Sequence, residues 1–166
     1  REETGEPERA TLDALLAFLE AHLHEFDAVL VSDYAKGVVS EELMTRLHRL
    51  LDTIRARDGR PVPLIVDPKP VNLQYFTGAT VITPNHHEAA RMAGVRIEDE
   101  RSLLAAARHF RDDLGCEAVI ITRGEAGMAL RAIRYMPKPR SGTTTTKVSA
   151  SGPRSTKAMT MAKRNM

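Results

Sequence analysis

Ala79-Thr80-Val81-Ile82-Thr83-Pro84-Asn85-His86-His87-Glu88 is the stretch that decides the expected fold. Its apolar first half stops at Pro84, and its polar second half leads into the helix-forming run Ala89–Ala93. This pattern is typical of a buried strand that runs directly into a helix. A helix N-terminus carries partial positive charge and free N–H groups, and open α/β sheets bind ligands at the carboxyl ends of their strands. The stretch therefore predicts a turn that is suited to phosphate.

Two interpretations of Asn85 and Glu88 remain open at this stage. Asn85 is a suitable N-cap, and Glu88 three residues later has the spacing of a capping box. The same two side chains are also suited to a metal ion and phosphate groups, although a Glu that turns back to its cap is less free to reach a metal. The spacing alone favours capping. His86 and His87 point about 100° apart on a helix, so we expect surface histidines and not a zinc pair.

The rest of the chain alternates apolar, β-branched segments with segments of helical periodicity. Strands are predicted at 27–32, 62–66, 79–83 and 118–122, and helices at 11–26, 40–58, 85–94 and 99–114. Near-continuous apolar strands between helices are typical of a parallel sheet that helices cover on both faces. The sequence therefore predicts an α/β fold, in which 128–130 is expected to return as an antiparallel strand.

Polar residues follow each of the four predicted strands. Because the strands of a parallel sheet point the same way, these residues are expected to share one rim of the sheet. The four clusters are Ser32–Gly37, Asp67–Lys69, Asn85–Glu88 and Thr122–Gly127. Together they offer carboxylates, cations and glycines that let the backbone approach a ligand, and this inventory suits a nucleotide with Mg²⁺.

Each cluster by itself also has a plain structural explanation. Asp33 and Lys36 have the spacing of a loop ion pair, which is worth only ~0–1 kcal/mol when exposed. Lys69 lies between two prolines, as in an ordinary loop, and Gly124 and Gly127 are also typical turn residues. The prediction of a nucleotide site therefore rests on the coincidence of four polar strand ends.

The net charge of +2 hides an uneven distribution of charge. Residues 137–166 hold seven of the 24 Lys and Arg and none of the 22 Asp and Glu, so this tail carries +7 and residues 1–136 carry −5. The basic character therefore belongs to the tail and says nothing about the body. The tail has almost no large apolar side chains with which to offset the entropy of ordering. We expect one domain at 1–136 and a basic, disordered tail at 137–166.

Cysteine content and hydropathy indicate where in the cell the protein is expected. The single Cys116 excludes an internal disulfide and is expected to be a small buried apolar residue, as in a reducing cytosol. No apolar run approaches the ~20 residues of a membrane span, and the acidic, polar N-terminus does not resemble a secretory signal. We therefore expect a cytoplasmic protein without a membrane partner.

Taken together, the motifs resemble those of the ribokinase-like (PfkB) carbohydrate kinases. Over roughly residues 10–135, the matching segments come in family order: Val31–Gly37, Val66–Lys69, Thr83–Glu88 and Ile121–Met128. The Ser-Asp-Tyr-Ala-Lys-Gly form of the first segment favours the heptose 7-phosphate kinase branch. In that branch the kinase is also found fused to a heptose 1-phosphate adenylyltransferase of ADP-heptose and lipopolysaccharide core synthesis. The resemblance implies a ribokinase-like α/β fold with a partial Rossmann-like sheet, phosphoryl transfer from Mg-ATP to the C1 hydroxyl of a sugar phosphate, and a cytoplasmic protein of a family that is often homodimeric.

The resemblance also implies roles for individual residues. Asn85 and Glu88 match the family's Asn-x-x-Glu motif, which serves Mg²⁺ and the ATP phosphates, with Glu88 as the metal residue, directly or through water. Lys69, with Lys36 and Asp33, is expected near the phosphate groups and the substrate. Mg²⁺ and Lys are suited to phosphoryl transfer, because its catalysis is mostly positioning and charge stabilisation. The implied ATP-binding residues are Asn85, His86, His87, Glu88, Thr122, Gly124 and Gly127.

Three features of the family are absent from these 166 residues. The family places a sugar-binding segment and a β lid before this region and a Gly-Ala-Gly-Asp loop after it, and the Asp of that loop is the general base. No acidic residue follows Glu125, so the resemblance implies a kinase fragment that is inactive alone and has no catalytic base of its own. The alternatives are a fragment of another PfkB-family sugar kinase, or a module whose basic tail binds nucleic acid. The acidic body and the lack of aromatic residues in the tail count against nucleic-acid binding.

Overall fold

The computed structural model of the chain describes residues 5, 7–132 and 161–163. Its α-helices are α1 (Arg9–His22), α2 (Glu41–Asp58), α3 (His86–Ala93) and α4 (Glu100–Leu114). Its strands are β1 (Phe26–Ser32), β2 (Leu64–Asp67), β3 (Val81–Ile82), β4 (Ala118–Thr122), β5 (Met128–Ala132) and β6 (Met161–Lys163). The 3₁₀ segments are η1 (Leu23–Glu25), η2 (Pro70–Phe76) and η3 (Gly124–Ala126).

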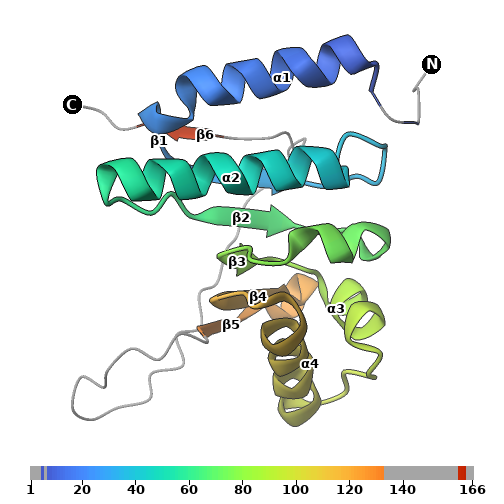
Figure 1. Cartoon of the computed structure of the whole chain (residues 1–166). Helices are drawn as coiled ribbons and strands as arrows, with labels where there is room; N and C mark the ends of the chain where they lie inside the picture. Colours follow the sequence, from blue (N-terminus) through green and yellow to red (C-terminus); the bar gives the residue numbers. More distant parts are fainter. Residues whose placement is uncertain (1–4, 6, 133–160, 164–166) are drawn as a thin grey trace.

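The strands form one mixed sheet in the order β5-β4-β3-β2-β1-β6 (Figure 1). β1 to β4 are parallel neighbours, whereas β5 pairs antiparallel with β4 and β6 pairs antiparallel with β1. The predicted α/β class and the antiparallel return at 128–130 are confirmed. Met161–Lys163, which the composition led us to expect in a disordered tail, form β6. The remainder of that tail, 137–160 and 164–166, lies outside the described residues.

Local sequence signals set most of the helix ends. Ser40 caps α2 by accepting a hydrogen bond from the Leu43 N–H at 3.3 Å, and α2 ends where Gly59 takes a φ of +65°. The first helix begins at Arg9 and ends at His22, shorter than the predicted 11–26 at its C-terminal end, because η1 follows it. η2 occupies a connection for which no element was predicted.

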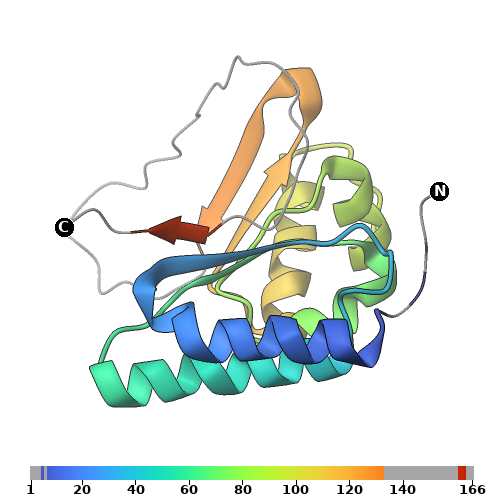
Figure 2. The ribbon, with the colours of Figure 1, turned by 90° about the horizontal axis from the view of Figure 1, so that it is seen from above.

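The described helices all lie against one face of the sheet, the inner face. In each parallel strand, buried residues alternate with half-buried ones, and the register places the buried ones side by side on that face. They join two apolar clusters, one under α1 and α2 and the other under α3 and α4. Figure 2 shows α1 and α2 side by side along β1. The buried strand residues are Val29, Val31, Leu64, Val66, Ile82, Val119 and Ile121.

The predicted arrangement of helices on both faces differs from the described one. β1 to β4 lie across the sheet in chain order, and right-handed connections between successive strands must then all run over the same side. The opposite face, which we call the open face, has no described helix over it. Its apolar residues include Leu30, Ile65, Val81, Ala118, Ile120 and Leu130.

Candidate functional site

The four polar clusters predicted from the sequence do lie along one rim, at the carboxyl ends of β1 to β4. The Asp33 N–H donates to the Asp67 carbonyl at 2.9 Å, which joins the first two clusters. Asn85 and Thr122 form a parallel bridge, and the Thr122 N–H donates to the Pro84 carbonyl at 3.0 Å. The backbone therefore brings to one rim residues as far apart in the chain as Asp33 and Thr122.

Glu88 holds the start of α3 with one carboxylate oxygen. Its Oε2 accepts from the Asn85 N–H at 3.0 Å, while Asn85 Oδ1 accepts from the Glu88 N–H at 2.9 Å. This is a complete capping box, so the capping interpretation of the sequence is confirmed. The metal interpretation then concerns only the other oxygen, Oε1.

Lys69 occupies that second oxygen of Glu88. Its Nζ donates to Glu88 Oε1, and the Glu88 side chain is 12 % exposed whereas that of Lys69 is 39 % exposed. The pair joins the end of β2 to the start of α3 and neutralises a carboxylate that is mostly removed from water. Another cation could displace the Lys69 ammonium from Glu88 Oε1, because the lysine side chain is flexible and carries a compact point charge.

The capping box leaves two backbone donors at the start of α3. In the part of the chain that the structure describes, no group accepts a hydrogen bond from the N–H of His86 or His87. Their imidazole rings stand perpendicular to each other with centroids 5.5 Å apart. The two residues are therefore placed to contribute backbone N–H groups to an anion, with no role required of the rings.

The turn after β4 leaves open space beside its glycines. The Arg123 N–H donates to the Gly127 carbonyl at 2.7 Å, and the Gly127 N–H donates to the Gly124 carbonyl at 3.1 Å. Gly124 and Gly127 have φ of +58° and +81°, which a side chain would strain. A Cβ on either would meet no atom within 4 Å. The backbone here is accessible to a ligand that lies over Thr122 and Asn85.

Asp33 lies at this rim as predicted, but its carboxylate is directed into the protein. It is the buried charged residue among those described, at 3 % exposure. Its Oδ1 accepts from the Ala35 N–H at 2.7 Å, and its Oδ2 accepts from the Lys69 N–H at 3.2 Å and from Asn72 Nδ2 at 2.9 Å. Asp33 therefore ties the loop after β1 to the loop after β2 and fixes the backbone that carries Lys69.

The loop after β1 has an unusual backbone conformation. Ala35 has a φ of +54°, and it is the non-glycine residue with positive φ in the described chain. This left-handed conformation costs roughly 1–2 kcal/mol for an L-residue, and the hydrogen bond from its N–H to Asp33 helps to hold it. Lys36, expected near phosphate, follows in this loop, and it is half-buried.

Mg²⁺ is compatible with the side chains on this rim. It takes oxygen ligands, keeps several waters, and is commonly held by one or two carboxylates together with substrate phosphates. Glu88 Oε1 is one such oxygen, and Asp67, whose Oδ2 accepts from Ser32 Oγ at 3.4 Å, is a second carboxylate at the end of β2. Across the described residues, no group of three or more His, Cys, Asp and Glu forms a metal-binding cluster, so the phosphates would have to complete the shell.

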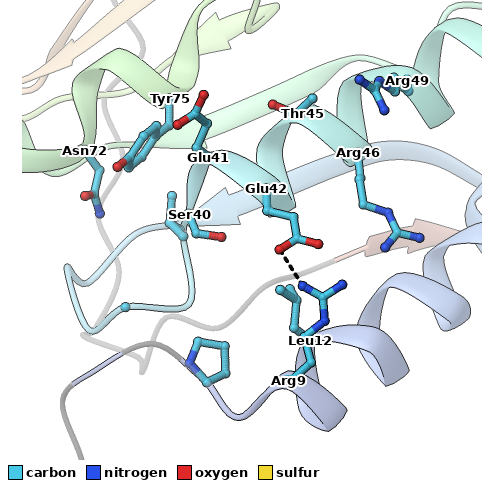
Figure 3. Close-up of a pocket in the computed structure, with 13 residues that line it drawn as sticks. Arg9, Leu12, Ser40, Glu41, Glu42, Thr45, Arg46, Arg49, Asn72 and Tyr75 are labelled. Atoms are coloured by element: carbon cyan, nitrogen blue, oxygen red, sulfur yellow. Dashed lines mark hydrogen bonds and ion pairs between the residues drawn. The ribbon is translucent and has the colours of Figure 1, made fainter.

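A separate cavity lies between the N-terminal ends of α1 and α2, the loop that precedes α2, and η2 (Figure 3). Arg9 Nη1 donates to Glu42 Oε2 at 2.8 Å there, and Arg46 Nη2 donates to Glu20 Oε1 at 2.9 Å. The cavity shares Gly37 with the rim cluster that follows β1, but no residue of the β3 or β4 ends lines it. Its lining comes from three separate segments of the chain, 7–12, 37–49 and 72–75, which is why no single sequence motif marked it.

Two buried titratable side chains, Cys116 and His48, lie outside the rim. Cys116 is 3 % exposed, which confirms the expected small buried residue, and burial raises the pKa of its thiol. His48 on α2 has a buried Nε2 without a hydrogen-bond partner, and burial lowers the pKa of its ring although Asp52 acts in the opposite direction. The described helices include none that is long and apolar enough to cross a membrane.

The motifs on the rim are those of a known family. The model of the pfkB family of carbohydrate kinases matches residues 4–150. The chain belongs to the PfkB family of carbohydrate kinases. This PfkB match continues past 136, where the sequence predicts the domain to end, so the division at 136 stays a prediction.

Curated relatives with similar sequences include a heptose 7-phosphate kinase and bifunctional HldE proteins. The chain is 40 % identical to the D-beta-D-heptose 7-phosphate kinase of Bordetella bronchiseptica over 124 residues, which are 75 % of this chain and 37 % of that protein. It is 38 % identical to the bifunctional protein HldE of Desulfatibacillum aliphaticivorans over 130 residues, which are 78 % of this chain and 25 % of that protein. The chain therefore spans about a quarter to two-fifths of these relatives.

Solved structures with the same fold agree with the PfkB assignment. Phosphofructokinase-2 from Escherichia coli in complex with potassium matches with a TM-score of 0.58 at 15 % identity, over 76 % of this chain and 40 % of that one. The ADP complex of Bacillus subtilis pyridoxal kinase matches with a TM-score of 0.56 at 18 % identity, over 80 % and 57 %. At these identities the likeness concerns the fold alone, and it confirms the predicted ribokinase-like α/β class.

Proposed function

We propose that this chain forms the Mg-ATP-facing part of a heptose 7-phosphate kinase, which transfers phosphate from ATP to the C1 hydroxyl of the sugar. The observation that carries the proposal is the rim itself, where Asn85, Glu88, Thr122 and Lys69 meet beside the open backbone of the Gly124 turn. The heptose branch is supported by the D-beta-D-heptose 7-phosphate kinase of Bordetella bronchiseptica, to which this chain is 40 % identical over 124 residues.

Bound Mg²⁺ would neutralise charge on the ATP phosphates. Glu88 Oε1 would hold the ion, directly or through water, and Oε2 would keep α3 capped throughout. Lys69, released from Glu88, would place its ammonium on a phosphate oxygen. The N–H groups of His86 and His87 would add donors at the positive end of α3. These groups position and stabilise charge, which is most of what phosphoryl transfer requires from a protein.

We also propose that these 166 residues do not transfer phosphate by themselves. They contain no acidic residue after Glu125 and therefore none in the place of the family's general base. Asp33 does not replace it, because its carboxylate is buried and accepts three hydrogen bonds from protein donors. The cytoplasmic location and the homodimeric state are proposals of the same kind, drawn from the family.

Calorimetric titration with Mg-ATP tests the nucleotide site. We expect measurable binding that Glu88→Gln weakens at least tenfold, because the variant removes the charge at Oε1. Gln at this position still completes a capping box, so α3 keeps its start. Glu100→Gln, in the exposed first turn of α4, is the matched control and should bind as the parent does. Absence of Mg-ATP binding to the parent chain would refute the site.

A phosphotransfer assay tests the second part of the proposal. With heptose 7-phosphate and Mg-ATP, we expect no turnover above background. Turnover that Glu88→Gln abolishes would show that a base exists in this chain and would overturn the proposed inactivity.

A further inference from the structure

The cavity at the start of α1 and α2 has the size of a small-molecule site. Its volume is about 980 Å³, and ligand pockets in general measure about 300–1,000 Å³. Arg9, the first residue of α1, pairs with Glu42, the second residue of α2, so the two helices begin side by side at this cavity. Each helix carries partial positive charge at its N-terminus, so the cavity lies where two such charges meet.

Three arginines add full positive charges to the lining. In Figure 3 the Arg46 side chain extends from α2 toward α1, and the Arg9 side chain extends from α1 toward α2. Both keep N–H donors to spare, because a guanidinium carries five of them and the pairs with Glu42 and Glu20 use one nitrogen each. Arg49 follows one turn after Arg46, and within the described residues its guanidinium has neither an ion pair nor a hydrogen bond. The cavity therefore has donors for an anion that the protein itself does not use.

Hydrogen-bond acceptors line another part of the cavity, at η2 and the start of α2. Figure 3 shows the side chains of Glu41, Asn72 and Tyr75 in this part. No group in the described chain donates a hydrogen bond to the Glu41 carboxylate. Asn72 donates through Nδ2 to Asp33 Oδ2 at 2.9 Å, which leaves its Oδ1 as an acceptor. Carboxylate and amide oxygens of this kind accept hydrogen bonds from hydroxyl groups.

The two parts together define the chemistry of a ligand. We propose that the cavity binds a small sugar phosphate, with its phosphate at Arg9, Arg46 and Arg49 and its hydroxyl groups at Glu41 and Asn72. A phosphate ester suits the arginines better than a carboxylate does, because it brings up to two negative charges and three acceptor oxygens. This site is separate from the Mg-ATP site at the rim, and its existence does not rest on nucleotide binding.

Asn72 connects the cavity to the rim. Its backbone N–H donates to the Lys69 carbonyl at 3.0 Å, and its side chain donates to Asp33, which accepts from the Lys69 N–H at 3.2 Å. A sugar hydroxyl on Asn72 Oδ1 would hold this side chain in place and, through Asp33, the backbone of Lys69. The sugar phosphate is therefore an effector that stabilises the loop on which Lys69 is presented.

Calorimetric titration of the full chain with glucose 6-phosphate tests the site. We expect binding that Arg49→Gln weakens at least about tenfold, because the variant removes a charged donor. Arg55→Gln is the matched control, because Arg55 is exposed on the same helix and does not line the cavity. Inorganic phosphate and glucuronate should each bind at least about tenfold more weakly than glucose 6-phosphate, because the first lacks hydroxyl groups on a sugar and the second lacks the phosphate. No binding of glucose 6-phosphate, equal weakening by both variants, or equally tight binding of either comparison compound would overturn the proposal.

Hydrogen exchange locates the bound ligand. With glucose 6-phosphate we expect slower exchange at 41–46 and at the amides of Lys69 and Asn72, and unchanged exchange at His86 and His87. Protection of His86 and His87 without protection of 41–46 would place the ligand at the rim and overturn the site. Unchanged exchange at Lys69 and Asn72 would overturn the connection to the rim. Mg-ATP titration of the parent chain is a separate measurement, so failure of the nucleotide site is distinguishable from failure of the cavity site.

Discussion

At the scale of single residues, sequence and structure assign Asp33 different tasks. The motif placed it near phosphate, yet its two oxygens accept from the N–H groups of Ala35 and Lys69 and from the side chain of Asn72. Sequence spacing could indicate that Asp33 follows a strand but not which way its carboxylate turns, because Asn72 lies 39 residues away. The consequence is that Asp33 positions Lys69, and through it Glu88.

Replacing Asp33 should therefore damage the fold before it damages chemistry. We expect Asp33→Ala to lower the free energy of unfolding by about 2–4 kcal/mol, because it leaves buried donors without acceptors. Urea denaturation followed by circular dichroism measures the change. Asp112→Ala is the control: Asp112 is exposed and pairs with its neighbour Arg111, so stability should hardly change. Equal effects of the two substitutions would contradict the assigned role.

His48 should make stability depend on pH. Burial lowers the pKa of its ring below the ordinary value of 6.5, so folding favours the neutral form. The contribution of neutral His48 to the free energy of unfolding is therefore complete above pH 6.5. It is lost as the pH falls through the lowered pKa of the ring in the folded state. We expect the urea midpoint to fall between pH 7.5 and pH 5, and His48→Leu to reduce that fall.

The control for His48 is His87→Gln, because His87 is exposed at the start of α3. It should leave the pH dependence as in the parent. If His48→Leu and the parent respond identically to pH, the buried ring is not responsible.

At the scale of elements, the sequence predicted best where a local signal fixes the boundary. Ser40 and Gly59 delimit α2, and Asn85 and Glu88 start α3, in agreement with their capping patterns. β3 is reduced to Val81–Ile82 within an apolar run of five, because apolar composition marks burial and not the extent of strand pairing. η2 was not predicted, because a short 3₁₀ segment that begins at Pro70 has no long apolar periodicity.

The cap of α3 gives a prediction at this scale. Asn85→Ala removes the acceptor for the Glu88 N–H and should lower the free energy of unfolding by about 1 kcal/mol, whereas Asn85→Ser should recover most of it. Thermal and urea unfolding of the three proteins measure the difference. Equal stability of the Ala and Ser variants would mean that the capping box does not stabilise this helix.

At the scale of the whole molecule, strand composition predicted helices on both faces of the sheet, because β1 to β4 carry apolar residues on both faces. The described helices cover only one of these faces. The site could be predicted as a rim because parallel strands end together, which is a property of topology. The Lys69–Glu88 pair and the inward turn of Asp33 could not be predicted, because they depend on loop geometry that strand periodicity does not encode.

The pairing of β6 with β1 changes which strand lies outermost. Without it, the seven residues of β1 would end the sheet and present unpaired backbone groups to other chains; with it, the outermost strand on that side is the three residues of β6. A short border strand offers few groups for cross-molecule β pairing, which is one way that proteins limit aggregation. The register shift between Phe26 and Ala28 interrupts the ladder further. Met161–Lys163 thus limit the pairing of a foreign strand with this side of the sheet.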